Sequence, residues 1–249
     1  MIQSVPSMLR RPLFATALLL VTGGVALAQP AQEGPKNLKV LPKDWTRAQV
    51  INVMEAFTAA LGVGCNHCHV QKQGSPPDFA SDDKEEKNKA RAMLKITRDL
   101  NARLPMDFGE PASELTRIQC ITCHRGVPEP KQLGEILAKT SAEKGFPAAK
   151  AQYMDLKSKY YGSQAYDFSE NGLIATARPL VRNRADEAVE FLEFNLEMFP
   201  KSAESYVLLA EAQVTKNDKA GAIKSLETAL QIDPRNFGAR RALNQLKGQ

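Results

Sequence analysis

The sequence predicts an all-α protein in two parts, residues 36–130 and 148–249, joined by a linker at 131–147. In the first part, apolar residues recur at helical spacing between capping sequences and helix-ending residues. In the second part, Pro200 and Pro234 lie 34 residues apart, a period typical of helical repeats. With 43% hydrophobic and 24% charged residues, the 249-residue chain cannot be disordered, collagen-like or a multi-span membrane protein.

Residues 1–28 have the features of a secretory signal peptide. Arg10 and Arg11 precede the apolar stretch 13–27, and the tripeptide at 26–28 is a small-x-small cleavage site. The stretch is too short for a comfortable membrane span, which disfavours the alternative of an uncleaved anchor. No cysteine lies near the cleavage site, so a lipid-modified terminus is not expected. We expect an exported chain, periplasmic or beyond, that is soluble after cleavage and has no transmembrane segment.

A first helix is expected between Thr46 and Gly62. Thr46 and Gln49 form a capping box, and the glycine ends the helix. One face of this helix is mostly apolar and comprises Val50, Ile51, Met54, Phe57, Thr58 and Leu61.

A second helix is expected to begin near residues 81–83 and to end at Pro105. Glu85 and Lys89 form a supportive pair four residues apart. Its apolar face comprises Ala90, Met93, Ile96, Thr97, Leu100 and Leu104.

All four cysteines fall in two equally spaced pairs, and a histidine follows each pair directly. The two motifs are Cys65-x-x-Cys68-His69 and Cys120-x-x-Cys123-His124. Two thiols one helical turn apart can form thioethers with the two vinyl groups of one haem, and the next histidine then lies under the iron. The motifs therefore predict two covalently attached c-type haems, with His69 and His124 as proximal iron ligands.

Two other uses of the cysteines were weighed. An exported C-x-x-C pair can form a disulfide or a redox centre, but neither requires a histidine after each pair. Two pairs can also make a four-thiolate zinc site, for which about 15–20 residues usually separate the pairs. Cys68 and Cys120 lie too far apart for such a compact site.

The histidine count limits what can bind the far side of each iron. The chain has three histidines, and the third, His67, is two residues from His69 and cannot reach the far face of the same haem. Two bis-histidine haems are therefore excluded. We expect Met54 and Met93 as distal ligands, with Met106 as the alternative for the second iron. Without the haem motifs, a methionine on an apolar helix face would be assigned to the core.

Four stretches resemble the cytochrome subunit of photosynthetic reaction centres: residues 37–54, 61–69, 90–101 and 120–128. The resemblance covers about 36–130. In that family each repeat is a helix carrying a methionine, a turn, and a haem-binding helix, which implies Met54 and Met93 as distal ligands. The family commonly carries four haems and is often anchored through an N-terminal cysteine. This chain has two motifs and no such cysteine, which favours a two-haem relative serving another redox chain.

The second part resembles tetratricopeptide repeats most closely in its last full unit. The matching positions are Tyr206, Leu209, Ala210, Ala222, Leu226, Ala229 and Pro234. The preceding unit departs from the pattern, because Pro179 interrupts its leading helix and Asn195 replaces a small residue. Residues 237–247 are expected to form a capping helix, and the linker to contain a short helix at 132–140.

Two repeats and a capping helix bury too little apolar surface to be more than marginally stable on their own. We therefore expect this region to pack on the haem domain, on residues 148–168, or on another protein. It serves either as a docking module for a redox partner or a second copy, or as a scaffold that covers one side of the haem domain.

The sequence favours an electron carrier that exchanges electrons with protein partners and is not an enzyme. A haem enzyme of the peroxidase or nitrogen-oxide reductase type is the first alternative; it requires an open iron and an acid–base group, and no distal histidine is available. A haem-based sensor or assembly module is the second. The net charge of +5 comes with no basic stripe carrying interleaved aromatic residues, so a nucleic-acid partner is not expected. Much of the core of the haem domain should be porphyrin.

Overall fold

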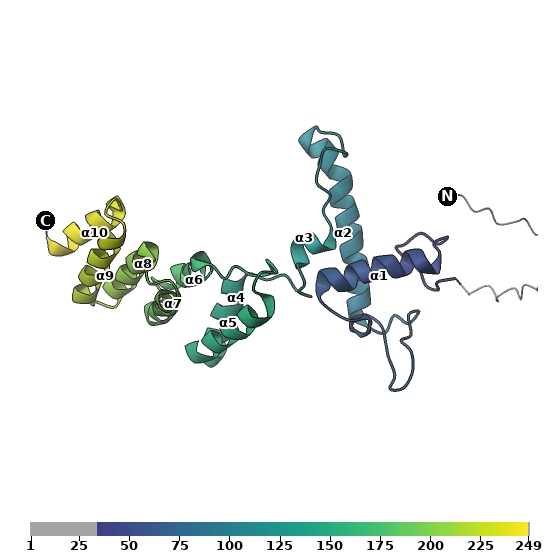
Figure 1. Cartoon of the computed structure of the whole chain (residues 1–249), viewed down its shortest axis with the longest axis horizontal. Coiled ribbons are helices and arrows are strands. Elements are labelled where there is room, and N and C mark those ends of the chain that lie inside the picture. Colours follow the sequence, from purple (N-terminus) through teal and green to yellow (C-terminus); the bar gives the residue numbers. More distant parts are fainter. Residues whose placement is uncertain (1–33, 249) are drawn as a thin grey trace, which may run out of the picture. The chain divides into compact units, whose positions relative to one another are not determined.

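The computed structural model describes residues 34–248, so the signal-peptide segment 1–28 lies outside the described residues. Every regular element in the described range is a helix, apart from one isolated antiparallel bridge between Val70 and Asp78. The predicted all-α class is therefore confirmed (Figure 1).

The first part contains three α-helices and a 3-10 turn at Cys65–His67. The helices are α1 (Arg47–Leu61), α2 (Glu85–Phe108) and α3 (Cys120–His124). The second part contains seven α-helices and a 3-10 turn at Arg178–Leu180. These helices are α4 (Leu133–Lys144), α5 (Phe146–Tyr160), α6 (Glu170–Ala177), α7 (Ala185–Met198), α8 (Ala203–Thr215), α9 (Lys219–Ile232) and α10 (Phe237–Lys247).

Helix α1 has the ends that the sequence predicts. The Thr46 hydroxyl accepts a hydrogen bond from the Gln49 N–H, and the Gln49 side chain accepts one from the Thr46 N–H at 2.8 Å. At the other end, Gly62 adopts the left-handed conformation with φ of 66°. This conformation lets the Gly62 N–H reach the Thr58 carbonyl and close the last turn.

Helix α2 is displaced from its predicted bounds at both ends. Its N-cap is Lys84, because residues 81–83 have no regular secondary structure and the helix begins after them. The prediction that Pro105 ends the helix is wrong: α2 continues to Phe108 and ends at Gly109, whose φ is 69°. Pro105 lies near the last turn, where its missing N–H removes only one bond of the helix. The predicted pair of Glu85 and Lys89 is confirmed at 3.7 Å.

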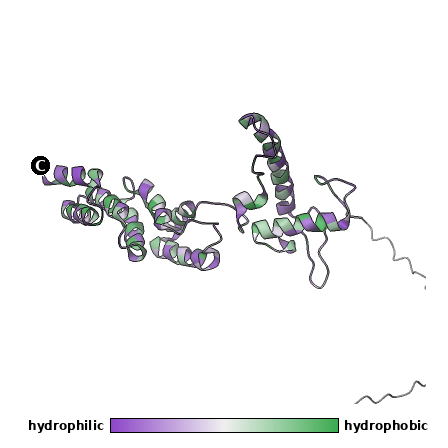
Figure 2. Ribbon diagram, turned by 45° about the horizontal axis from the view of Figure 1, so that its top comes forward, coloured by the Kyte–Doolittle hydropathy of each residue, from purple (hydrophilic) through white to green (hydrophobic). Residues whose placement is uncertain are grey.

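The second part is a series of helices that pack against their neighbours in the chain. Contacts join α4 to α5, α6 to α7, α7 to α8, α8 to α9, and α9 to α10. Hydrophobic and hydrophilic residues alternate along these helices (Figure 2), as expected where one face of each helix is buried. Buried side chains from α4 through α8 form one cluster that includes Leu137, Tyr153, Leu173, Phe191 and Leu208.

The segment expected as a linker contributes to this cluster. Leu133 and Leu137 of α4 are buried in it, and α4 packs on α6 as well as on α5. The expected short helix at 132–140 is thus longer, extending to Lys144. In the structure, this segment belongs with the C-terminal helices.

The two departures from the repeat pattern have local explanations. Pro179 lies in the 3-10 turn that follows α6, so the leading helix is interrupted there, as predicted. Asn195 is fully buried in α7, and its amide donates a hydrogen bond to the Ser205 hydroxyl at 2.8 Å. That hydroxyl lies 2.8 Å from the Ser202 hydroxyl, which donates to Glu170. A polar chain thus replaces the usual contact between small residues.

Candidate haem-attachment sites

The first motif forms a tight turn between α1 and the loop before α2. The His67 N–H donates to the Gly64 carbonyl, and the His69 N–H donates to the Cys65 carbonyl, both at 3.0 Å. This turn brings the sulfur-bearing residues within one helical turn of each other, with Cys65 exposed and Cys68 half-buried. Burial, followed by the Glu86 carboxylate, raises the pKa of the Cys68 thiol, which keeps it protonated at neutral pH.

His69, which ends this motif, is the one buried polar residue between residues 34 and 130. The Phe79 ring contacts it edge-on, with ring centroids 5.0 Å apart. Its Nδ1 atom is buried and has no hydrogen-bond partner. Burial, and then the cations of Lys87 and Arg91, lower the pKa of His69. The imidazole is therefore neutral at neutral pH, which is the form that binds a metal.

The turn that carries the first motif is held by Lys84, the N-cap of α2. Its ammonium group donates hydrogen bonds to the backbone carbonyls of Asn66 and His67, the two residues between the cysteines. The beginning of α2 is thus tied directly to the first motif.

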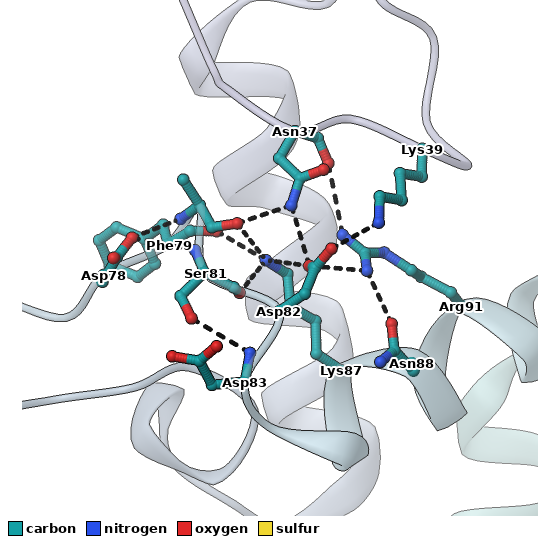
Figure 3. A network of polar contacts seen from close by, with 11 residues as sticks. Asn37, Lys39, Asp78, Phe79, Ser81, Asp82, Asp83, Lys87, Asn88 and Arg91 are labelled. Carbon is teal, nitrogen blue, oxygen red and sulfur yellow. Dashed lines mark hydrogen bonds and ion pairs between the residues drawn. The ribbon is translucent and has the colours of Figure 1, made fainter.

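Asp82 is the centre of a polar network beside the first motif (Figure 3). Its carboxylate accepts hydrogen bonds or ion pairs from Lys39 at 2.6 Å, Arg91 at 2.8 Å, Asn37 at 2.9 Å and Lys87 at 3.1 Å. The hydrogen bonds from Lys39 and Asn37, followed by those from Lys87 and Arg91, hold the pKa of Asp82 far below its usual range. The network joins the N-terminal segment to the first two turns of α2.

The same network fixes the loop that carries Phe79. The Lys87 ammonium donates to the carbonyls of Phe79, Ala80 and Ser81 at 3.0, 3.2 and 2.6 Å. Because the Phe79 ring contacts His69, the network also fixes the position of the aromatic ring that covers the His69 imidazole. Sequence reasoning missed this role, since Asp82 was assigned to a helix N-terminus.

The second motif is helix α3 itself. Its N-terminus is closed by the Thr122 hydroxyl, which accepts from the Gln119 N–H at 3.0 Å. His124 ends the helix, and its Nδ1 lies 2.9 Å from the Val127 carbonyl, so that this nitrogen donates and Nε2 stays available. This arrangement suits a proximal haem ligand, because the hydrogen bond at Nδ1 orients the ring for metal binding through Nε2.

The segment after the second motif packs on the end of α1. The Gly126 N–H donates to the Ala60 carbonyl at 2.9 Å, and α1 and α3 are in contact. A Cβ atom on Gly62 would lie 2.1 Å from the Gly126 carbonyl oxygen, so only glycine fits there. Helix α1 therefore supports the loop that follows His124.

The segment before the second motif is held by Asn101 of α2. The Asn101 side chain donates to the Ile118 carbonyl and accepts from the Ile118 N–H, both at 2.8 Å. Sequence reasoning did not assign this residue a role, because an asparagine within a helix gives no signal of a distant backbone partner.

The three candidate methionines lie on α1 and α2. Met54 is half-buried on α1. Met93 is 46% exposed on α2, beside other exposed apolar side chains, whereas Met106 is 77% exposed in the last turn of that helix. The assignment of Met54 and Met93 as distal ligands stays a prediction.

The first part has few buried side chains of its own. Between residues 34 and 130, the buried residues are Leu41, Ala60, His69 and Val127. Large apolar side chains are instead exposed in this part of the chain: Ile51, Phe79, Met93, Ile96, Leu100, Met106, Phe108 and Ile121. A protein of this size needs an apolar core to fold, and apolar macrocycles attached at the motifs would cover such surfaces. The residues present therefore fit haem.

The four thiols do not converge on a metal site. Each cysteine is free in the structure. Within residues 34–248, no group of three or more His, Cys, Asp or Glu residues is placed to hold a metal ion. The same range contains no helix with the length and apolar character that a membrane span requires.

Three comparisons relate the chain to known cytochromes. Cytochrome c-554 of Chloroflexus aurantiacus is 38% identical over 82 residues, which are 32% of this chain and 18% of that protein. The photosynthetic reaction centre cytochrome c subunit of Thermochromatium tepidum is 37% identical over 103 residues, 41% of this chain and 23% of the subunit. The corresponding subunit of Rubrivivax gelatinosus is 33% identical over 100 residues, 39% and 24% of the two chains.

The alignments thus span about a fifth to a quarter of the length of these relatives. A family model described as the photosynthetic reaction centre cytochrome c subunit matches residues 23–211, which include both motifs and extend into α8. The chain belongs to the family of the photosynthetic reaction centre cytochrome c subunit.

Proposed function

We propose that this protein is an exported dihaem c-type cytochrome that passes electrons between redox proteins and is not an enzyme. Membership of the cytochrome family implies a covalently bound c-type haem and a role in electron transfer. The number of haems, their ligands, the export and the partners are our proposal.

The observation that carries the proposal is the exposure of large apolar side chains in the part of the chain that holds both motifs and buries few side chains of its own. A catalytic pocket would require polar groups that converge on a cavity. Exposed apolar side chains of this kind would instead pack against a macrocycle. The attached groups would supply reversible one-electron chemistry at iron.

The residues of the chain would bind and orient these groups. Cys65 and Cys68 would attach one haem, and His69, kept neutral by burial and nearby cations, would be its proximal ligand. In the same way Cys120 and Cys123 would attach the other, with His124 oriented by the Val127 carbonyl. Methionine as the second ligand favours a higher potential than a second histidine would.

Met54 and Met93 would complete the two sites from α1 and α2. With a methionine bound to each iron, neither iron would be open to a substrate, which favours a carrier over a haem enzyme. The segment 1–28 would direct export, and the helices of residues 148–249 would dock a redox partner or a second copy.

The test uses the full chain produced in a host that matures c-type cytochromes. We expect absorption spectra of a c-type haem, pigment that stays with the protein in acidified organic solvent, and no rapid binding of carbon monoxide. The paired variant Cys65→Ala/Cys68→Ala and the paired variant Cys120→Ala/Cys123→Ala should each lose one haem. Colourless protein, or extractable pigment, would contradict attachment. Rapid carbon monoxide binding would favour the haem-enzyme alternative.

A further inference from the structure

Asn101 makes a two-point contact with a residue far from it in sequence. Its side-chain nitrogen donates to the Ile118 carbonyl and its side-chain oxygen accepts from the Ile118 N–H, each at 2.8 Å. Two antiparallel hydrogen bonds to one residue fix both the position and the rotation of that stretch of backbone, as a neighbouring strand would. A single hydrogen bond would fix neither.

Ile118 lies two residues before Cys120, at the entry to the second motif. The chain between Gly109 and Gln119 contains no helix. Helix α3 has only five residues, and so short a helix has little stability of its own. Its placement therefore depends on its flanks, which are held by Asn101 before the helix and by the Gly126–Ala60 hydrogen bond after it.

Asn101 is also in register with Met93 on α2. Met93, Thr97 and Asn101 are spaced four residues apart, so they lie along one side of the helix. The Thr97 hydroxyl donates to the Met93 carbonyl, and the Asn101 amide donates to the Thr97 carbonyl, both at 2.8 Å. A helix rises about 1.5 Å per residue, so Asn101 and Met93 are separated by about 12 Å of rigid helix.

We propose that Asn101 is a positioning residue for the second haem. It locks Ile118 to α2 and thereby sets the spacing between the helix that carries Met93 and the motif that carries His124. This inference rests on the proposed function, in which those two side chains are opposite ligands of one iron. Met106 is five residues from Asn101, on a different side of α2, and is not in this register.

The first motif has a different attachment to α2, which makes the effect of Asn101 selective. Lys84 at the start of the helix holds the carbonyls of Asn66 and His67. Asn101, in the second half of the helix, bonds to Thr97 on its own helix and to Ile118 at the entry to the second motif. Changes at Asn101 should therefore alter one haem and leave the other intact.

The experiment compares Asn101→Ala, Asn101→Asp and the control Asn52→Ala in the full haem-loaded chain. Asn52 is an exposed residue of α1. Asn101→Asp keeps the shape and can accept from the Ile118 N–H, but it cannot donate to the Ile118 carbonyl. Met93→Ala and Met54→Ala serve as references that identify the signals of the second and the first haem.

The readouts are the far-red charge-transfer band of an iron–methionine bond, the two reduction potentials, and carbon monoxide binding. We expect Asn101→Ala to lose the same part of the band as Met93→Ala, to lower the same potential, and to let carbon monoxide bind one haem. Asn101→Asp should change the same signals less, and Asn52→Ala should match the unaltered protein.

Two results would overturn the inference while the proposed function stands. One is an Asn101→Ala protein with both haems attached and unchanged signals. The other is an equal change at both haems, which would indicate general loosening of the fold. Failure of the proposed function is distinct, because the unaltered protein would then lack two attached haems. If Asn101→Ala does not fold, Asn101→Asp supplies the same comparison.

Discussion

Gly62→Ala tests whether α1 supports the loop that follows the second motif. Gly62 has a φ of 66°, and a Cβ atom added there would lie 2.1 Å from the Gly126 oxygen and 2.9 Å from its carbonyl carbon. Carbon and oxygen atoms do not approach closer than about 3 Å, so the two segments must separate by about 1 Å. The hydrogen bond from Gly126 to the Ala60 carbonyl would be weakened at the same time.

The expected loss of stability has two components. A left-handed conformation costs a non-glycine residue about 1–2 kcal/mol. The steric clash of the added Cβ atom with the Gly126 backbone, which has no rotatable side chain to relieve it, adds about 1–3 kcal/mol to the loss of stability, the usual range for overpacking. The free energy of unfolding should therefore fall by about 2–5 kcal/mol in Gly62→Ala.

Gly109→Ala is the matched control. Gly109 also ends a helix in the left-handed conformation, with φ of 69°, but an added Cβ atom there meets nothing within 4 Å. It should lose only the conformational component, about 1–2 kcal/mol. The assay is urea unfolding of the haem-loaded protein, followed by circular dichroism. Equal losses in the two variants would refute the packing of Gly62 on Gly126.

Three further predictions concern ligands, charge and packing. Met54→Ala and Met93→Ala should each remove part of the far-red band and lower one reduction potential, whereas Met106→Ala should change neither the band nor the potentials. If instead Met106→Ala changes these signals and Met93→Ala does not, Met106 is the ligand of the second iron. The depressed pKa of Asp82 stabilises the fold above its ordinary pKa of about 4, and this stabilisation is lost as pH falls through the folded value. Asp82→Asn should therefore be less stable at pH 7 and lose less on acidification, as measured by unfolding at several pH values; an unchanged slope would contradict this. Asn195→Ala should lower the free energy of unfolding by about 1–3 kcal/mol in urea titrations, since it removes the bond to the Ser205 hydroxyl, and unchanged stability would mean that the polar chain is dispensable.

The sequence predicted the local features well because their causes are local. The capping box at Thr46 and the helix-ending glycine at Gly62 each depend on residues that are close together in the sequence, and the structure confirms both. The cysteine motifs are equally local, since one helical turn is enough to define them. The family resemblance is confirmed by a match over residues 23–211.

The sequence failed where contacts between distant residues decide the structure. Asp82 looked like a helix cap, but Lys39 and Arg91 draw it into a network and the helix begins later. The segment at 131–147 looked like a linker because the stretch 126–147 is rich in Pro, Gly and Lys, although Leu137 is fully buried. Asn101 gave no sign of its partner, because the hydrogen-bonding capacity of a side chain does not reveal which backbone it meets.

A mass measurement of the purified chain tests the central claim most directly. It reports cleavage of the leader and the number of attached porphyrins in one spectrum. The account predicts the mass of residues 29–249 plus two haems, with no haem lost under denaturing conditions. A mass without added porphyrin, or with a single porphyrin on a chain that retains all four cysteines, would contradict it.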